Sequence, residues 1–378
     1  MLMESSLSSR DTAVAPAAVA ATGPTVADLD FQDRILPHVS RTFALTIPQL
    51  PEALQRVIAN AYLLCRIADT IEDEPALSRE QKLHYSRRYV ACVAGTAPPE
   101  RLAQELAPLL TGSTLAAERE LVAGLPSLLR ITWSFNSRQR RALEQCVEIM
   151  CRGMACFQMN QSLQGLPDLP ALDSYCYHVA GVVGEMLTEL FCDYSPEIDA
   201  CRERLHLLGI SFGQGLQMTN ILKDIWEDRA RGACWLPRAV FAEAGFDPGD
   251  LQPGRNGPAF RQGLSRLIGI AHAHLRNALE YSLLMPPGET GIRRFCLWAL
   301  GMAVLTLQRV HRHPDFASGR EVKISRRAVR LTVAATSAAV RSDRALRLMF
   351  ATAARGLPLH PVQMVPAATL QQPCLHRL

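Results

Sequence analysis

The chain has 378 residues, of which 48% are hydrophobic and 20% are charged, so it is long and apolar enough to bury a large core. Its 40 Lys and Arg residues nearly balance 36 Asp and Glu residues, and a net charge of +4 gives no sign of a nucleic-acid-binding protein. The eleven cysteines are scattered and lack a Cys-x-x-Cys pair with a His partner, which favours reduced thiols in a cytoplasmic compartment over a disulfide or zinc framework.

Both ends of the chain differ in composition from its middle. Residues 1–28 are rich in Ala, Ser, Thr and Pro and lack the basic start and apolar core of a secretory signal, so we expect a disordered tail. Residues 356–378 hold four prolines and are expected to be irregular. No linker divides 29–355, which we predict to be one helical domain. Its longest apolar runs, 295–307 and 331–340, fall short of the roughly 20 residues that span a bilayer and favour core helices.

The first candidate site residues lie at Ser40–Phe43, which reads Ser-Arg-Thr-Phe before an apolar segment. Ser40 or Thr42 could cap a helix, which is the more usual role of such residues. Arg41 could instead bind phosphate oxygens through two of its guanidinium nitrogens.

The next predicted helix carries an acidic cluster, Asp69-Thr70-Ile71-Glu72-Asp73. Pro51 precedes this helix and Pro75 follows it, as proline does at helix ends. A polar stripe at helical spacing between apolar residues is formed by Tyr62, Arg66, Asp69 and Asp73. Carboxylates on one helix face repel each other unless a cation neutralises them, and Mg²⁺ suits such oxygen ligands. A single cluster of this kind is nevertheless more often a solvated helix end.

The predicted helix over 171–192 contains Tyr175–Gly184 (YCYHVAGVVG), in which two glycines and an alanine stand close together. Each glycine costs a helix about 1 kcal/mol relative to alanine, so these small residues need a reason. They permit close approach of another helix or leave room for a ligand, and both explanations stay open. Tyr175 adds a hydroxyl and an aromatic face, and such a face attracts cations.

A second acidic cluster, Asp224-Ile225-Trp226-Glu227-Asp228, lies in the predicted helix over 202–230. Its polar stripe resembles the first in spacing and consists of Gln217, Asn220, Asp224 and Asp228. A polar stripe on an otherwise apolar helix is costly to bury unless it is paired or bound to a metal. Because there are two, we expect them to face each other across a bundle and to hold a diphosphate between Mg²⁺ ions.

The remaining segments also have helical spacing, and strand-like alternation is almost absent. These segments are 141–163, 258–284, 290–312 and 325–353. The sequence therefore predicts an all-α bundle with a central cavity. Between the last two segments lies the basic run Arg320–Arg327, which is either a solvated loop or a site for the phosphates of a second, charged cofactor.

Four of these motifs, in this order, resemble the squalene and phytoene synthase family of head-to-head prenyl synthases. They are Ser40–Phe43, Tyr62–Asp73 (YLLCRIADTIED), Tyr175–Gly184 and Gln217–Asp228 (QMTNILKDIWED). The resemblance extends over about 30–350. It implies a single all-α isoprenoid synthase domain, with apolar walls around Leu187, Phe191, Phe212 and Phe295.

The resemblance also implies roles for individual residues. Mg²⁺ ligands are implied at Asp69, Glu72, Asp73, Asn220, Asp224 and Asp228. Catalytic roles are implied for Tyr175, Asp69, Asp73, Asp224 and Asp228. Contacts to the substrate diphosphate are implied at Ser40, Arg41, Tyr62, Arg66, Gln217 and Lys223. Contacts to NADPH are implied at Arg41, Arg66, Lys223, Lys323 and Arg326.

The implied reaction joins two farnesyl diphosphates into presqualene diphosphate, which NADPH then reduces to squalene. Three departures from the family's eukaryotic pattern concern mainly the reductive step: Lys223 stands where arginine is common, Ser325 stands where the animal enzymes have a basic residue, and Ala299-Leu300 replaces a Pro-Gln pair. A non-reductive presqualene diphosphate, dehydrosqualene or phytoene synthase is the main alternative. A helical protein that only binds a prenyl diphosphate is another.

The resemblance further implies where the protein works. Eukaryotic members carry a C-terminal membrane anchor that this sequence lacks, which points to a bacterial-type enzyme. We expect a cytoplasmic protein with at most a peripheral contact to the membrane, and the resemblance implies no obligate protein partner.

Overall fold

A computed structural model describes residues 23–375, except for the side chains of 41, 42 and 373–375. The α-helices are α1 (Val26–Val39), α2 (Arg41–Thr46), α3 (Glu52–Asp73), α4 (Arg79–Val93), α5 (Pro99–Leu106), α6 (Ala116–Ala123), α7 (Leu125–Ser134), α8 (Ser137–Met159), α9 (Leu169–Cys176), α10 (Val182–Tyr194), α11 (Pro196–Asp199), α12 (Arg202–Lys223), α13 (Ile225–Ala230), α14 (Arg238–Ala242), α15 (Gly257–Leu284), α16 (Thr290–Arg312), α17 (Gly319–Val322), α18 (Arg326–Ala339), α19 (Asp343–Ala353) and α20 (Ala367–Leu375). Short helices of other types are η2 (Ile47–Gln49), η3 (Ala107–Leu109), the π-helix η4 (Tyr177–Gly181) and η5 (Pro248–Asp250). No strand forms within residues 23–375, which confirms the all-α prediction.

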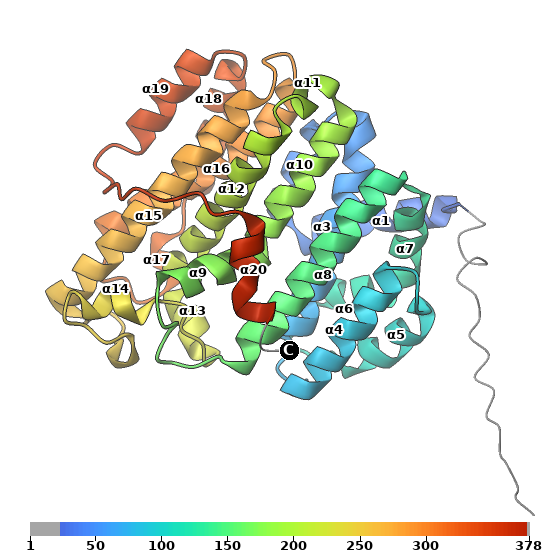
Figure 1. Cartoon of the computed structure of the whole chain (residues 1–378), viewed down its shortest axis with the longest axis horizontal. Coiled ribbons are helices and arrows are strands. Elements are labelled where there is room, and N and C mark those ends of the chain that lie inside the picture. Colours follow the sequence, from blue (N-terminus) through green and yellow to red (C-terminus); the bar gives the residue numbers. More distant parts are fainter. Residues whose placement is uncertain (1–22, 376–378) are drawn as a thin grey trace, which may run out of the picture.

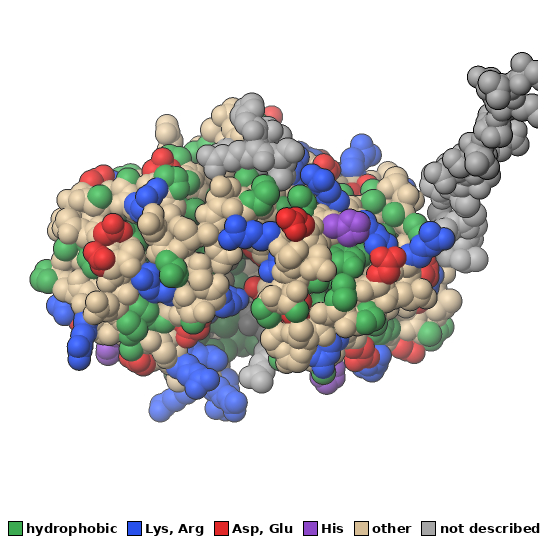
Figure 2. Space-filling model, turned by 90° about the horizontal axis from the view of Figure 1, so that it is seen from below, with side chains coloured by type: hydrophobic (Ala, Val, Ile, Leu, Met, Phe, Trp, Pro, Cys, Tyr) green, Lys and Arg blue, Asp and Glu red, His purple; other side chains and the backbone are tan. Residues whose placement is uncertain are grey.

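The long helices run side by side through the middle of the molecule, with α12 packed against α10, α15 and α16 (Figure 1). The short helices α4 to α7 cover one end of this bundle and α18 and α19 cover the other. One continuous core of buried apolar side chains extends from Ile35 to Leu370. Figure 2 shows that the face seen from below is hollowed near its middle, with Lys and Arg side chains at the rim.

By length and composition, α16 is the one helix within residues 23–375 that could cross a membrane. Its most apolar stretch is mostly buried, and the helix packs against α12, α15 and α18. This burial fits the core helix that the apolar run 295–307 predicts.

The structure differs from the predicted elements at both ends of the domain. Helix α1 begins at Val26, because Thr25 and Asp28 form a reciprocal cap at its start, so helix precedes the predicted boundary at 29. The tail predicted before it falls mostly on 1–22, outside the described residues. Part of the C-terminal segment predicted as irregular is the helix α20, which contacts α9. Its Leu370 is buried, and the Leu370 carbonyl accepts a hydrogen bond of 2.7 Å from Ser174 Oγ.

Three predicted helices are interrupted. The segment 171–192 contains the π turn η4 between α9 and α10. The segment 202–230 breaks at Asp224, between α12 and α13. The segment 325–353 ends its first helix before Val340 and starts again at α19, where Ser342 Oγ accepts from Ala345 N. The apolar spacing of the sequence continues across each interruption. It depends on which helix faces are buried and not on the backbone hydrogen bonds, so it could not indicate the breaks.

The first acidic cluster is followed by Glu74, a buried carboxylate that fixes the end of α3 to a distant loop. Its oxygens accept hydrogen bonds from Ala76 N at 2.9 Å, Thr111 N and Thr111 Oγ1 at 2.8 Å each, and Thr114 Oγ1 at 2.7 Å. Burial by itself would raise the pKa of Glu74, but these hydrogen bonds outweigh it and lower the pKa to about 2.

We expect Glu74→Gln to lower the free energy of unfolding at pH 7 by about 2–3 kcal/mol, because the amide NH₂ would meet two donors and leave them unpaired. Since the folded-state pKa of about 2 lies below the usual 4.5, the carboxylate stabilises the fold fully above pH 4.5 and loses this effect as the pH falls toward 2. The difference in the free energy of unfolding between wild type and variant, measured by urea denaturation, should therefore become smaller below pH 4.5. Exposed Glu52→Gln is the control, and equal stability of Glu74→Gln and wild type at pH 7 would contradict the assignment.

Candidate active site

The two acidic clusters meet at one arginine, Arg231. Its Nη1 lies 3.1 Å from Asp73 Oδ1 at the end of α3, and its Nη2 lies 2.6 Å from Asp228 Oδ1 on α13. The ends of the two predicted stripes are therefore close together. Arg231 is not among the predicted site residues, although its position three residues after Asp228 places it one helical turn away and could have indicated an ion pair.

Burial and mutual repulsion act on the carboxyl groups of both clusters. Burial, followed by the neighbouring Asp73, raises the pKa of Asp69 to about 7, although Arg66 opposes this. Burial with Asp73 and Asp69 raises the pKa of Glu72 to about 8. Burial also raises the pKa of Asp228 to about 6 against the effect of Arg231. The chain's own cations therefore do not fully neutralise this acidic region.

The donor atoms of this region fit Mg²⁺, because they are carboxylate and amide oxygens. Across the described residues, no three Asp, Glu, His or Cys side chains converge on one point. Each ion would then take one or two ligands from the chain and the rest from water and phosphate, which is how Mg²⁺ is usually held. The break at Asp224 preserves the stripe, since Asp228 N still donates to Asp224 O at 2.9 Å. Metal binding by these residues stays a prediction.

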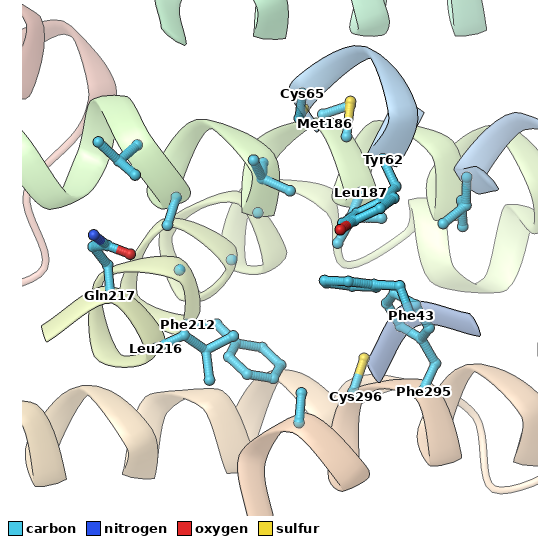
Figure 3. Close-up of a pocket in the computed structure, with 18 of the residues that line it drawn as sticks. Phe43, Tyr62, Cys65, Met186, Leu187, Phe212, Leu216, Gln217, Phe295 and Cys296 are labelled. Atoms are coloured by element: carbon cyan, nitrogen blue, oxygen red, sulfur yellow. The ribbon is translucent and has the colours of Figure 1, made fainter. Parts of the chain in front are cut away.

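A cavity of about 310 Å³ lies between α3, α10, α12 and α16. Asp69, Gln217 and Asn220 belong to its lining, so both polar stripes reach the same space. Figure 3 shows Gln217 at one end of the cavity and the rings of Phe43, Tyr62 and Phe295 at the other. The cavity therefore combines a polar end with aromatic and aliphatic walls.

Most of the predicted walls border this cavity. Leu187, Phe212 and Phe295 line it. Phe191 is not among its lining residues and lies behind Phe295, with the two ring centroids 6.4 Å apart. Tyr62 is part of the lining, but its hydroxyl donates to Val39 O at 3.2 Å and its ring lies against Phe43.

The small residues of η4, α10 and α12 serve both purposes that the sequence leaves open. A Cβ atom on Gly184 would collide with the carbonyl of Gly209, and one on Gly213 would collide with the carbonyl of Ala180. The two helices can therefore approach each other only because these positions lack side chains. The same four residues also line the cavity, so close packing and space for a ligand occur together.

Tyr175 is not among the residues that line the cavity. Its ring stacks on Trp235, with centroids 4.1 Å apart and planes 11° apart, and meets Phe157 edge to face. Burial, followed by the nearby Glu72 and Asp228 carboxylates, raises the pKa of Tyr175 well above its usual value. Tyr175 thus lies against Trp235 and near the acidic clusters. No motif or spacing in the sequence indicated its partner, Trp235.

We expect Tyr175→Phe to keep the stack on Trp235 and to lower kcat at least about tenfold if the hydroxyl acts in the reaction. Tyr175→Ala should also remove the buried ring and cost about 3–5 kcal/mol of stability. Thermal unfolding and turnover should be measured for both variants. Tyr89→Phe is the matched control, because Tyr89 is also buried and donates to Leu64 O at 2.8 Å. A fully active Tyr175→Ala enzyme would reduce the residue to core packing.

The predicted phosphate-binding cations have partners within the protein. Arg66 pairs with Glu118, with Nε 3.0 Å from Oε1, and its Nη1 lies 3.6 Å from Asp69 Oδ2. Lys223 Nζ lies 3.0 Å from Asp224 Oδ2. Glu118 belongs to no motif, so sequence reasoning had no means of finding it. Arg66 and Lys223 therefore lie beside predicted metal ligands, where both cations are expected to contact the substrate diphosphate.

The Ser40–Phe43 motif supplies a helix cap. Phe43 N donates to Ser40 Oγ at 3.0 Å at the start of α2, which is the capping role considered for the pair. The side chain of Arg41, expected to bind phosphate, lies outside the described residues.

The basic run Arg320–Arg327 starts against the second acidic cluster. Gly319 N, just before the run, donates to Glu227 Oε1 at 3.0 Å. A Cβ at Gly319 would lie 3.0 Å from Asp224 Oδ1, so only glycine fits this approach comfortably. Lys323 and Arg326 in the run are exposed. Segments nearly a hundred residues apart in the sequence are thus neighbours at one site.

Comparison of sequences relates the chain to known proteins. The squalene/phytoene synthase family model matches residues 36–328. The squalene synthase of Yarrowia lipolytica is 26% identical over 290 residues, which are 74% of this chain and 61% of that protein. Squalene synthase LSS of Botryococcus braunii is 29% identical over 304 residues, which are 77% of this chain and 60% of that protein. The chain thus spans about three fifths of the length of the curated relatives that it matches.

Solved structures share the fold. The structure of TcSQS with the ligand BPH1237 has a TM-score of 0.68 at 21% identity and covers 92% of this chain and 96% of that one. Squalene synthase HpnC from Alicyclobacillus acidocaldarius has a TM-score of 0.54 at 19% identity and covers 76% of this chain and 94% of that one. The all-α isoprenoid synthase fold is therefore confirmed. Since the family match extends over most of its length, the chain belongs to the squalene/phytoene synthase family.

Proposed function

We propose that this chain is a squalene synthase, which condenses two farnesyl diphosphates into presqualene diphosphate and reduces it with NADPH to squalene. The observation that carries the proposal is the cavity of about 310 Å³ with apolar walls and a polar end formed by residues of both acidic stripes. Farnesyl diphosphate matches this cavity, since it has a long apolar chain that ends in a charged group. Two facing carboxylate clusters suit a substrate whose diphosphate must be bound and then released.

The described side chains suggest how the first half-reaction is assisted. Mg²⁺, when bound, would neutralise the diphosphate and make it a better leaving group. Arg66 and Lys223 lie beside Asp69 and Asp224, where they can bind oxygens of the departing diphosphate. The apolar walls keep water away from the reacting carbons. Tyr175 borders the acidic clusters and can orient groups at the polar end of the cavity.

NADPH fits the basic run Arg320–Arg327. Lys323 and Arg326 are exposed cations with no ion pair among the described residues, so they are free to bind the phosphates of a cofactor. Gly319, just before the run, is hydrogen-bonded to Glu227, which would place the cofactor next to the second acidic cluster. The ten described cysteines form no disulfide with one another and nine of them are buried, which suits a cytoplasmic enzyme.

A non-reductive synthase that stops at presqualene diphosphate, dehydrosqualene or phytoene is the second candidate. One observation favours it: Ser325, where a basic residue stands in animal squalene synthases, is occupied as the cap of α18 and accepts from Ala328 N at 3.1 Å. The basic run therefore offers one cation fewer than those enzymes do.

Product analysis with farnesyl diphosphate and Mg²⁺, with and without NADPH, separates the candidates. We expect diphosphate release in both reactions and squalene only with NADPH. The same full set of products without NADPH would replace the proposal by the non-reductive synthase. If the protein released no diphosphate in the presence of Mg²⁺, the result would favour a protein that only binds a prenyl diphosphate.

A further inference from the structure

The segment 319–355, which holds α17, α18 and α19, carries an unusual share of positive charge. It contains nine Lys and Arg residues and two acids, a net charge of +7, whereas the whole chain carries +4, so the remainder is −3. Asp343 is already paired with the buried Arg293. In this segment Arg330, Arg341 and Arg344 are exposed, and none of them has an ion-pair or hydrogen-bond partner among the described residues. The positive charge of these three arginines is therefore available to an outside partner.

The two helices of this segment repeat one pattern. Ser325–Ala334 reads SRRAVRLTVA and Ser342–Ala351 reads SDRALRLMFA, so six of the ten positions are identical. Each helix begins with a serine cap, and each exposes a leucine directly after an arginine. Leu331 is 60% exposed and Leu348 is 69% exposed. Helices α18 and α19, which carry these two leucines, lie together at one end of the molecule (Figure 1). Arg347, the arginine before Leu348, is paired with Glu280.

An apolar groove of about 380 Å³ adjoins these helices. It is lined by residues of α15, α16, α18 and α19, including Leu331, Leu300 and Phe350, and no charged residue lines it. It is separate from the active-site cavity, because Leu300 and Gly301 of α16 face the groove while Phe295 and Ala299 face the cavity. The surface therefore combines unpaired arginines, exposed leucines and an apolar groove.

We propose that α18 and α19 form a docking surface for an anionic membrane. The arginines would bind lipid phosphates, Leu331 and Leu348 would enter the boundary between head groups and acyl chains, and the groove would accept part of an acyl chain. A nucleic acid would use the charge but would leave the leucines and the groove without partners. A second copy of the same surface would bring two segments of +7 together. An anionic lipid surface satisfies all three features.

The experiment is co-sedimentation of the full chain with vesicles. Vesicles of equal parts phosphatidylglycerol and phosphatidylcholine are compared with vesicles of phosphatidylcholine alone. We expect the protein to pellet with the anionic vesicles and to be released by salt. The double variant Arg330→Gln/Arg344→Gln should bind about 25-fold more weakly, since each arginine near an anionic surface strengthens binding about fivefold. Leu331→Ser/Leu348→Ser should weaken binding about tenfold.

Matched controls lie at the opposite end of the molecule. Arg101 on α5 is exposed, and Leu115 before α6 is 59% exposed, close to Leu331. Arg101→Gln and Leu115→Ser should bind vesicles like wild type. Diphosphate release without vesicles should stay unchanged in every variant, so failure of this proposal is distinct from failure of the enzymatic one.

Four outcomes would overturn the docking surface. The first is wild type that stays in the supernatant with anionic vesicles at low salt. The second is unchanged binding by both double variants. The third is a shift from dimer to monomer in sedimentation velocity on mutation of the leucines, which would make the surface a subunit interface. Equal binding of duplex DNA and vesicles, lost in the arginine variant and kept in the leucine variant, would indicate general polyanion binding and would also reject the proposal.

Discussion

Asp69→Asn and Asp224→Asn should each lower the rate of diphosphate release from farnesyl diphosphate by about a thousandfold or more. Each substitution removes a negative charge from one of the two facing clusters and weakens its hold on Mg²⁺. Asp69 lines the cavity, and Asp224 lies one turn before Asp228 beside Lys223. Both variants keep the size of the side chain, so helical content should not change. The measurement is single-turnover release of diphosphate at saturating substrate.

The second cluster supplies its own control for this experiment. Glu227 points to Gly319 N and lies outside the predicted metal ligands. Glu227→Gln keeps an oxygen acceptor for that hydrogen bond and should retain most of the first half-reaction. Near-normal turnover in a folded Asp69→Asn or Asp224→Asn variant would reject the metal assignment. Excess Mg²⁺ should partly restore these variants if weaker binding is the cause.

Lys323→Ala combined with Arg326→Ala should change the product, with presqualene diphosphate or non-reduced alcohols replacing squalene at ordinary NADPH concentrations. Two cations paired with a cofactor phosphate give charge-assisted hydrogen bonds, so their loss should raise the KM for NADPH by about a hundredfold. Neither residue belongs to the lining of the cavity, and farnesyl diphosphate ionisation should continue. The measurement is product distribution as a function of NADPH concentration, and high NADPH should partly restore squalene.

The neighbouring Arg341→Ala tests whether general loss of positive charge is sufficient. Arg341 is exposed in the same basic segment but lies outside the run Arg320–Arg327. It should leave the product unchanged. Equal loss of both half-reactions in the Lys323→Ala/Arg326→Ala variant would assign the run to the diphosphate site or to folding. The contact of Gly319, just before the run, with the second acidic cluster makes this alternative worth testing.

Helices were the most predictable part of the fold because their signals are local. Pro51 caps the start of α3, which ends at Asp73 just before Pro75, and the apolar spacing of 258–284 matches α15 almost residue for residue. Periodicity could not show the break at Asp224 or the π turn. It also could not place α20, because the burial of Leu370 against α9 depends on residues almost two hundred positions away.

The candidate site was predictable where its functional residues lie close together in the sequence. Asp69 and Asn220, from separate motifs, do reach one cavity. Partners from distant parts of the chain were not predicted, as Glu118 beside Arg66 and Trp235 beside Tyr175 show. These contacts are set by packing of distant segments, for which a single sequence carries no spacing signal.

The π turn Tyr177–Gly181 lies between α9 and α10. In a π turn each hydrogen bond closes over one residue more than in an α-helix, so the turn holds an extra residue without changing the direction of the side chains that follow it. Deleting one residue from Tyr177–Gly181 and closing the turn to α geometry would therefore keep the phase of α10, whereas deleting one residue after the turn, within α10, would rotate the later side chains by about 100°. The second deletion would turn Leu187 away from the cavity while Tyr175 kept its place on Trp235, so any redesign of the pocket through α10 must conserve the length of that helix.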